Sequence, residues 1–322
     1  FLLMSDARFA LLADTGILHF SGPDALAFLQ GQLSCDVAAL ETLRATYGSY
    51  NTPKGRMLAS FVLWRTADGF HMQLPRTLCE PLRKRLSMYV LRSKVQIADL
   101  DATCALVGIS GAQALAATQA AFGAVPPAAM ALCAVDGGWL LQFDAGRLEL
   151  IAHADALTRL EAALVTHAEA ADQNSWELAT IHAGIPVITP ATQEAFVPQM
   201  ANLDLIGGVS FTKGCYPGQE IVARTHYLGR LKQRMALARV VTTEPPRPGD
   251  AIYAASFGEQ AAGTVVNAAP AADGGFAVLA VIQTSTFSAN GLHLGSLAGP
   301  KLELQPMPYP VEVTELPGTK PA

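Results

Sequence analysis

One cysteine, Cys215, stands in a setting that can make a thiol reactive. It lies in the run SFTKGCYPGQEIVAR (residues 210–224), two residues after Lys213 and two before the Pro217-Gly218 pair. Proline presets its own φ and glycine accepts a positive φ, so this pair predicts a tight turn. The segment GQEIVARTHY then predicts a helix that starts just beyond the cysteine. A helix N-terminus and a nearby lysine both favour the thiolate, which is the nucleophilic and metal-binding form of the side chain.

Two interpretations of Cys215 follow from this spacing. The first is an exposed, activated thiol, with Lys213 as its cationic neighbour and His226 as a candidate base. The second is a buried structural cysteine in a tight loop, because unpaired cysteines are usually buried. The remaining cysteines lie in apolar surroundings that favour a structural role: Cys35, Cys79, Cys104 and Cys133.

The cysteine pattern also excludes several kinds of site. Five widely spaced cysteines include no C-x-x-C pair and no neighbouring histidine cluster. We therefore expect no disulfide framework, and no zinc ion or iron-sulfur cluster held by this chain alone. Cysteine chemistry here should be the chemistry of a single thiol.

The composition predicts a globular protein of two or three domains. The chain has 322 residues, of which 51% are hydrophobic and 15% charged, and single cores stop growing near about 250–300 residues. A net charge of -5 argues against direct nucleic-acid binding. Two basic segments, residues 76–94 and 213–234, are either solvated helix faces or contacts for an anionic partner. We find no membrane span or secretory signal in the sequence, and expect a cytoplasmic monomer.

The elements that must position Cys215 form two related units and a barrel. SGPDALAFLQ (21–30) and SGAQALAATQ (110–119) agree at six positions, which indicates an internal duplication. We expect an N-terminal α+β domain at 1–100 and a second at 101–243, the latter containing a long loop and the KGCYPGQE motif. After the proline-rich segment 242–250, short strands separated by Gly, Pro, Asn and Asp predict an antiparallel β-barrel at 244–322.

The motif and its surroundings resemble a known family. The run VPQMANLDLIGGVSFTKGCYPGQEIVARTHYLGRLKQR is similar to the signature region of the YgfZ-type folate-binding proteins, relatives of the glycine cleavage T protein, an aminomethyltransferase. SGPDALAFLQGQLSCDV, TYGSYNTPKGRMLASFVLWR, YVLRSKV and WELATIHAGIPVI agree with that assignment in order along the chain. The resemblance implies an α+β, glycine cleavage T protein-like fold of three lobes around a central folate pocket.

The resemblance also implies a function. It points to a tetrahydrofolate-binding accessory protein in iron-sulfur cluster assembly or repair, with iron-sulfur client proteins that include tRNA-thiolating enzymes. The functional thiol would be Cys215. The rest of the signature is Lys213, Gly214, Tyr216, Gly218, Gln219 and Glu220.

Two departures separate this chain from the aminomethyltransferases. Those enzymes carry adjacent aspartates, one of them catalytic, where this sequence has Ala59 and Ser60. A methyl group and a hydroxyl cannot replace a carboxylate in stabilising charge. A pterin-binding glutamate is replaced by His182, which matches the paired N-H donors of a pterin less well. The alternatives are a folate-dependent one-carbon transferase that uses another acid, and a thiol redox protein with a vestigial folate pocket.

Several further side chains are candidates for folate contacts. Asn51, Lys54 and Arg56 lie in a polar loop between two expected strands, and Gln199 and Asn202 lie in the long loop before the signature. Basic residues after Cys215 could attract the glutamate tail of a folate: Arg224, Arg230, Lys232 and Arg234. The competing interpretation is that these residues make surface ion pairs or satisfy the loop backbone.

Overall fold

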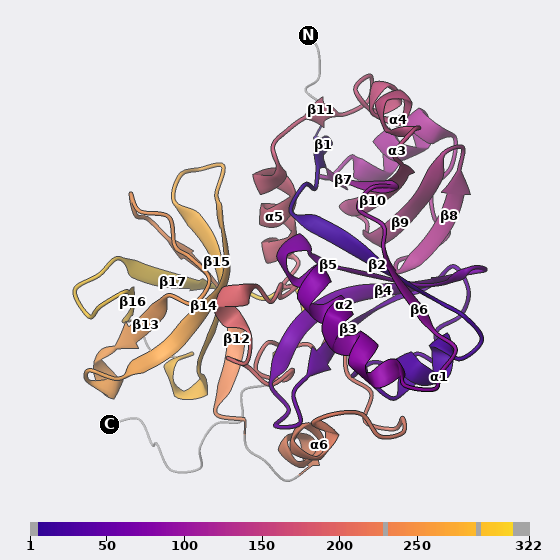
Figure 1. Ribbon diagram of the computed structural model, residues 1–322. Coiled ribbons are helices and arrows are strands. Elements are labelled where there is room, and N and C mark those ends of the chain that lie inside the picture. Colours follow the sequence, from indigo (N-terminus) through magenta and orange to yellow (C-terminus); the bar gives the residue numbers. More distant parts are fainter. Residues whose placement is uncertain (1–5, 228–230, 288–290, 312–322) are drawn as a thin grey trace.

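The protein consists of two helix-covered sheets and a closed barrel (Figure 1). The computed structural model describes residues 6–227, 231–287 and 291–311. Figure 1 shows the six barrel strands beside the two sheets, with α5 lying between them. The expected α+β architecture with a C-terminal barrel is confirmed. In the ranges described, no helix combines the length and apolar character that a bilayer crossing requires.

The first sheet has five antiparallel strands in the order β3-β4-β5-β2-β6. Helices α1 and α2 cover one face, where Phe28 and Leu82 contribute to a buried core. The other face meets the second sheet, so β4 is buried along nearly its whole length. The bounds are β2 Thr15–Ser21, α1 Ala25–Gln30, β3 Ala45–Asn51, β4 Met57–Thr66, β5 Gly69–Pro75, α2 Arg76–Val90 and β6 Gln96–Asp99.

The second sheet has six strands in the order β11-β1-β7-β10-β9-β8. Helices α3 and α4 cover its outer face, and β1 from the N-terminal part of the chain pairs with β7 and β11. Residues 8–11 therefore belong to the second sheet, although they precede the first. The bounds are β1 Arg8–Leu11, β7 Cys104–Ser110, α3 Ala114–Phe122, β8 Ala131–Val135, β9 Gly138–Asp144, β10 Arg147–His153, α4 Leu157–Leu164, β11 Glu169–Ala170 and α5 Gln173–His182.

The two sheets show the duplication that the sequence repeat indicated. Strand β2 leads into α1 through a Ser-Gly turn, and β7 leads into α3 in the same way. The next three strands form a meander in each unit, β3-β4-β5 and β8-β9-β10, whose last strand pairs with β2 or β7 respectively. The repeated sequence thus lies at equivalent positions in two units of the same topology.

The barrel begins earlier than the sequence suggested. Its strands close in the order β12-β15-β14-β13-β16-β17, and β12 ends before residue 244. The proline-rich segment 242–250 therefore connects two strands of the barrel, since its prolines suit a strand connection as well as a domain linker. The bounds are β12 Gln233–Val240, β13 Ala251–Ala254, η2 Ala255–Phe257, β14 Ala261–Pro270, β15 Phe276–Gln283, η3 Thr284–Thr286, β16 Leu292–Leu294 and β17 Lys301–Gln305.

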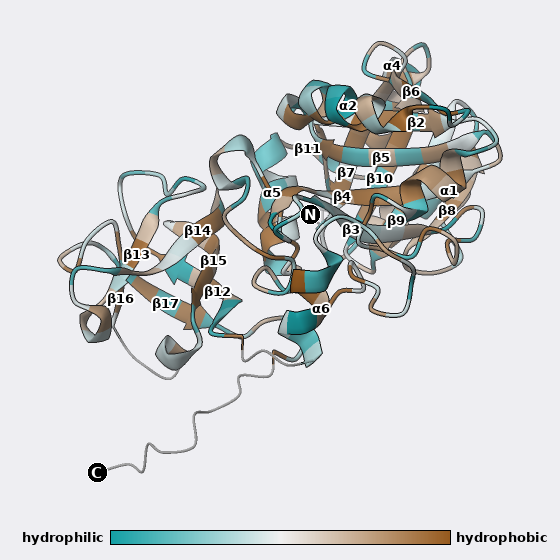
Figure 2. Cartoon of the chain, turned by 60° about the horizontal axis from the view of Figure 1, so that its bottom comes forward, coloured by the Kyte–Doolittle hydropathy of each residue, from teal (hydrophilic) through white to brown (hydrophobic). Residues whose placement is uncertain are grey.

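A central apolar core joins the three units. It contains Trp64 of the first sheet, Leu141 of the second, Trp176 of α5 and Leu279 of the barrel. The long loop after α5 contributes Phe196 and contains the short helix η1 (Pro190–Thr192). Figure 2 shows brown bands on strands of both sheets, with teal bands on β5, and hydrophilic teal segments on α2 and α6 (Gln219–Tyr227). Each sheet thus buries one face on its own helices and the other in shared packing.

One buried polar contact crosses between the two sheets. The Gln73 side-chain amide donates a hydrogen bond of 2.7 Å to Glu149 Oε2, and Glu149 is fully buried on β10. Burial raises the pKa of Glu149 to about 8, against the opposing effects of Gln73 and the Arg147 guanidinium. The carboxyl group is therefore mostly protonated at neutral pH.

This burial predicts a pH-dependent stability. An unfolded glutamate loses its proton near pH ~4.3, while folded Glu149 keeps it to about pH 8. The free energy of unfolding should therefore fall as the pH rises through this window, by about 4–5 kcal/mol in total. In Glu149→Gln this fall should disappear, because the amide stays neutral. Urea unfolding between about pH 4.5 and about pH 8 checks it, with exposed Glu259→Gln as the control; a variant slope equal to the wild-type slope would contradict it.

Candidate functional site

The signature segment forms the predicted turn and helix. The Gln219 backbone N-H donates to the Tyr216 carbonyl oxygen at 3.1 Å, and Gly218 has a φ of +81°. Pro217 and Gly218 thus occupy the two central positions of a turn whose second position requires a positive φ. Helix α6 starts at Gln219, and Cys215 is exposed ahead of it. Exposure favours the first interpretation of this thiol over a buried structural cysteine.

The turn packs against the loop between β3 and β4. A methyl group at Gly218 would lie 2.4 Å from the Thr52 carbonyl oxygen and 2.6 Å from Gly55 Cα. Gly55 in turn packs on Ile221 of α6. Only a residue without a Cβ allows this approach, so Gly218 is required both by its φ and by its contacts. The loop NTPKG and the motif KGCYPGQE form one surface, although about 160 residues separate them in the sequence.

Lys213 does not carry out the role that its sequence position suggested. Its ammonium group is buried and donates 2.7 Å hydrogen bonds to the carbonyl oxygens of Leu33 and Cys35. It also lies 5.3 Å from the centre of the Tyr216 ring. Burial lowers the pKa of Lys213. No hydrogen bond or ion pair joins it to Cys215 among the described residues, so Lys213 fixes the loop to the first unit instead of facing the thiol.

Buried polar groups lie under this surface. Both side-chain amide atoms of Asn51 are buried without a hydrogen-bond partner among the described residues, as are the Tyr216 hydroxyl and Gln199 Oε1. Of the other loop residues expected to bind folate, Lys54 is exposed, and Arg56 donates to the Ala195 carbonyl oxygen.

The expected folate contacts of the long loop are structural contacts here. Gln199 donates to the Val222 carbonyl oxygen at 2.6 Å, and Asn202 donates to that of Met235 at 2.9 Å. Arg234 forms a two-fold ion pair with Asp204, at 2.7 and 3.0 Å. These bonds tie the loop to α6 and to the first barrel strand. These contacts agree with the competing interpretation, in which the side chains satisfy the loop by hydrogen bonds and ion pairs.

The remaining candidates on α6 differ in their surroundings. Arg224 and Glu220 are exposed, and Arg230 lies outside the described residues. The His226 ring stacks on Phe211 with 3.8 Å between centroids. The stacking gives His226 a packing role, next to the exposed Tyr227.

A cavity of about 420 Å³ lies where the two sheets, α5 and the barrel meet. Its walls include Tyr47, Phe143 and Trp176, with polar groups from Gln73, Arg147, Glu177, Thr180 and Asn267. Trp176 lies flat on β7 because Gly108 has no side chain; a Cβ there would come within 2.5 Å of the indole. The volume of the cavity and its lining of both aromatic and polar side chains are typical of a small-molecule pocket.

The charged residues of this cavity are held by specific contacts. The Arg147 guanidinium is buried, donates to Asp144 at 2.8 Å and lies over the Phe143 and Trp176 rings. Glu177 accepts a hydrogen bond from Gln173. The Thr180 hydroxyl is buried with no partner in the described part of the chain. The cavity therefore offers aromatic faces, a cation and an unsatisfied hydroxyl to a ligand.

Of the residues that mark the departures from the aminomethyltransferases, Ser60 lines this cavity, but none of them supplies its charge. Ala59 is buried, and Ser60 uses its hydroxyl to bridge the Pro186 carbonyl oxygen (2.9 Å) and the Ile188 N-H (3.0 Å). His182 is exposed and is not part of the cavity wall. On the same helix, Glu177 and Thr180 face the cavity instead. Both residues were missed in the sequence analysis. Arg147 could have been found, because it and Glu149 are charged residues in the otherwise apolar segment GRLELIAH (146–153).

The comparisons agree with this geometry. The fold matches the glycine cleavage system aminomethyltransferase T of Bartonella henselae with a TM-score of 0.76 at 15% identity, over 93% of this chain and 84% of that one. The molecule therefore has the glycine cleavage T protein fold. No family model matches the chain.

Proteins of similar sequence identify the family, which the shared fold alone does not. The chain is 34% identical over 305 residues to the tRNA-modifying protein YgfZ of Sodalis glossinidius, covering 93% of this chain and 92% of that protein. It is 33% identical over 316 residues to the YgfZ of Klebsiella pneumoniae, covering 96% of each. The chain belongs to the YgfZ family of tRNA-modifying proteins, which confirms the resemblance seen in the signature.

The close packing of the turn predicts different effects for two signature glycines. Gly218→Ala should lower the free energy of unfolding by at least about 2 kcal/mol, because the new methyl group meets backbone atoms at a positive φ. Gly214→Ala, four residues before Gly218 and in an open position, should change it by less than about 0.5 kcal/mol. Urea unfolding of both variants measures this difference, and equal losses would contradict it.

Proposed function

We propose that this protein binds a reduced folate in the central cavity and supports iron-sulfur enzymes, including those that thiolate tRNA, through Cys215. The proposal places it in the cytoplasm with folate and iron-sulfur client proteins as its partners. Its strongest support is the aromatic-walled cavity at the junction of the three units. Membership of a family of tRNA-modifying proteins supports the link to tRNA.

The cavity residues fit a tetrahydrofolate. Tyr47, Phe143 and Trp176 offer faces for the flat pterin ring. The Glu177 carboxylate matches the paired N-H donors of a pterin, a role that the relatives' glutamate would have at the position of His182. Arg147 would contribute a cation beside the aromatic rings of the wall. When bound, the folate would supply a carrier of one-carbon groups.

Cys215 suits an accessory role toward a client protein. Its thiol is exposed at a turn that Gly218 and Lys213 fix to the first unit. One thiolate cannot hold an iron-sulfur cluster, because clusters take several such ligands. Cys215 would therefore share a cluster with a client during assembly or repair. Ile221 and Tyr227 on α6 are exposed and would offer a client two apolar side chains to contact.

The contacts of Ser60 favour this accessory role over aminomethyl transfer. Its hydroxyl is already engaged by two backbone groups, and Ala59 beside it is buried. Neither residue supplies the carboxylate of a transferase at this position. Folate binding without turnover is therefore the expected behaviour.

Blocking the cavity should abolish folate binding. Thr180→Trp places a large ring in the cavity, whereas His182→Trp places the same ring on the exposed face of α5. Anaerobic calorimetric titration with tetrahydrofolate should show saturable binding to the wild type, to Cys215→Ala and to His182→Trp. For Thr180→Trp we expect at least about 100-fold weaker binding, or ~2.7 kcal/mol. The cavity assignment would be refuted by loss of binding in His182→Trp with retention in Thr180→Trp.

Cys215 should be required for the cellular function but not for folding. In cells lacking the endogenous protein, Cys215→Ser should fail to restore tRNA thiolation, while Cys133→Ser, a half-buried cysteine of β8, should restore it. Both variants should unfold within about 1 kcal/mol of the wild type. Full restoration by Cys215→Ser would remove the thiol from the proposal while leaving folate binding untouched.

A further inference from the structure

A second cavity, of about 360 Å³, lies between the two sheets and apart from the folate cavity, with which it shares no lining residue. Its walls include Trp64 of β4 and Trp139 of β9. Unlike the first cavity, it is rich in groups that can bind a metal: His19, Asp68, His71, Cys104, His153 and Asp155. No function considered so far uses these side chains.

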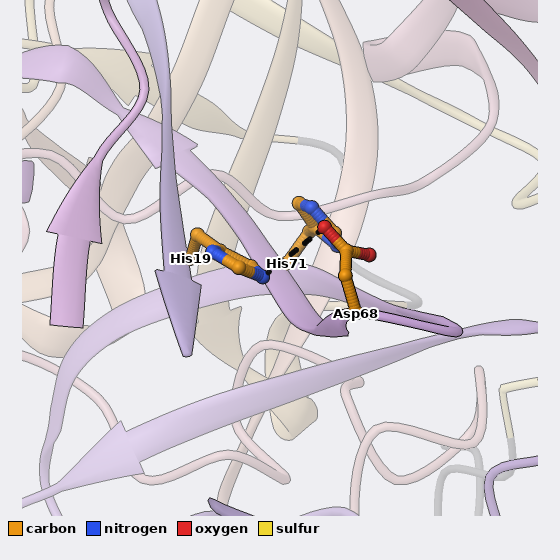
Figure 3. Close-up of side chains that lie close together, drawn as sticks. All are labelled: His19, Asp68 and His71. Atoms are coloured by element: carbon orange, nitrogen blue, oxygen red, sulfur yellow. Dashed lines mark ion pairs between the residues drawn. The ribbon is translucent and has the colours of Figure 1, made fainter. Parts of the chain in front are cut away.

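Three of these groups form a compact cluster (Figure 3). His19 of β2 and His71 of β5 are directly opposite each other in the antiparallel register, and their rings lie 4.5 Å apart at 27°. Asp68, in the turn between β4 and β5, brings its Oδ2 to 3.6 Å from His19 Nε2. One ligand atom from each of the three residues lies within 4.8 Å of the others.

The protein leaves this cluster incompletely bonded. His19 Nε2 is buried and makes no hydrogen bond to any described residue. A buried ring nitrogen that points at a carboxylate from beyond hydrogen-bond distance is unusual, because buried polar groups are generally paired. A cation bound between His19 and Asp68 would satisfy both groups.

Neighbouring side chains hold the cluster in place. The Thr66 hydroxyl donates to Asp68 Oδ1 and lies 3.4 Å from His71 Nδ1. The Trp64 indole stacks on His71 at 5.4 Å and 5°. Such outer contacts orient the ligands in metal sites.

We propose that His19, His71 and Asp68 bind a divalent first-row transition metal ion, with Zn²⁺ as the ion that best matches two imidazoles and one carboxylate. Zinc sites with three protein ligands keep a further position for water or substrate, and the adjacent cavity has room for such a ligand. The proposal departs from the expectation, based on cysteine and histidine spacing, that this chain holds no metal alone. It is independent of folate and of Cys215.

The proposal is tested on the untagged, chelator-treated full-length protein. Competition titration with Zn²⁺ against a chromophoric chelator should give one equivalent of tight binding per chain. Co²⁺, used as a spectroscopic probe, should show the visible absorption of a low-symmetry nitrogen- and oxygen-bound ion. Absence of tight Zn²⁺ binding to the wild type would overturn the proposal.

Matched variants identify the ligands. Asp68→Ala and Asp155→Ala both remove an exposed carboxylate from the same cavity, but only Asp68 belongs to the cluster. Asp68→Ala should weaken Zn²⁺ binding more than about 100-fold, which exceeds the usual effect of an outer contact, whereas Asp155→Ala should leave it unchanged. His19→Asn should abolish binding, and His182→Asn, at a distant exposed histidine, should not. Equal losses in the two aspartate variants, or undiminished binding in His19→Asn and Asp68→Ala, would refute the site. Circular dichroism confirms that each variant is folded.

Discussion

The structure depends on one packing constraint, which is that neither sheet can bury its inner face by itself. Each covers one face with its own two helices and leaves the other apolar. These inner faces, α5, the long loop and the barrel complete a single shared core. Burial of apolar surface is the dominant favourable term in folding, so the three units must assemble around this junction. Both cavities border this shared packing because large side chains from several elements cannot fill it completely.

The signature segment is fixed by backbone contacts more than by side-chain chemistry. Lys213 is bonded to carbonyl oxygens of the first unit, and Gly218 touches the loop at Thr52 and Gly55. A segment that bears the exposed Cys215 is thereby held at the edge of the first sheet. The thiol can face a partner while the rest of the motif remains part of the fold.

Local chemistry could be predicted from the sequence, whereas convergence of distant residues could not. The turn at Pro217 and Gly218 depends on adjacent residues. The duplication could be predicted because the segments SGPDALAFLQ and SGAQALAATQ agree at six positions. Lys213 was misjudged because nearness in sequence does not fix the direction of a long side chain. A central pocket was expected from the resemblance, but its lining residues escaped prediction because Tyr47, Arg147 and Trp176 come from different elements. The His19–His71 pair was hidden for the same reason: it depends on the register of β2 against β5.

The position of β1 has a consequence for the order in which the chain folds. Residues 8–11 precede the whole first sheet but pair with residues 107–110 and 169–170 of the second. During synthesis this strand emerges early and has no partner until residues 107–110 of β7 have followed, and its second partner, residues 169–170 of β11, comes only after about half of the chain. The first unit can form while β1 is still unpaired. The second unit is completed only when β1 inserts between β7 and β11. Such long-range closure is slow, and it makes the second half of the molecule dependent on an intact connection to its opposite end.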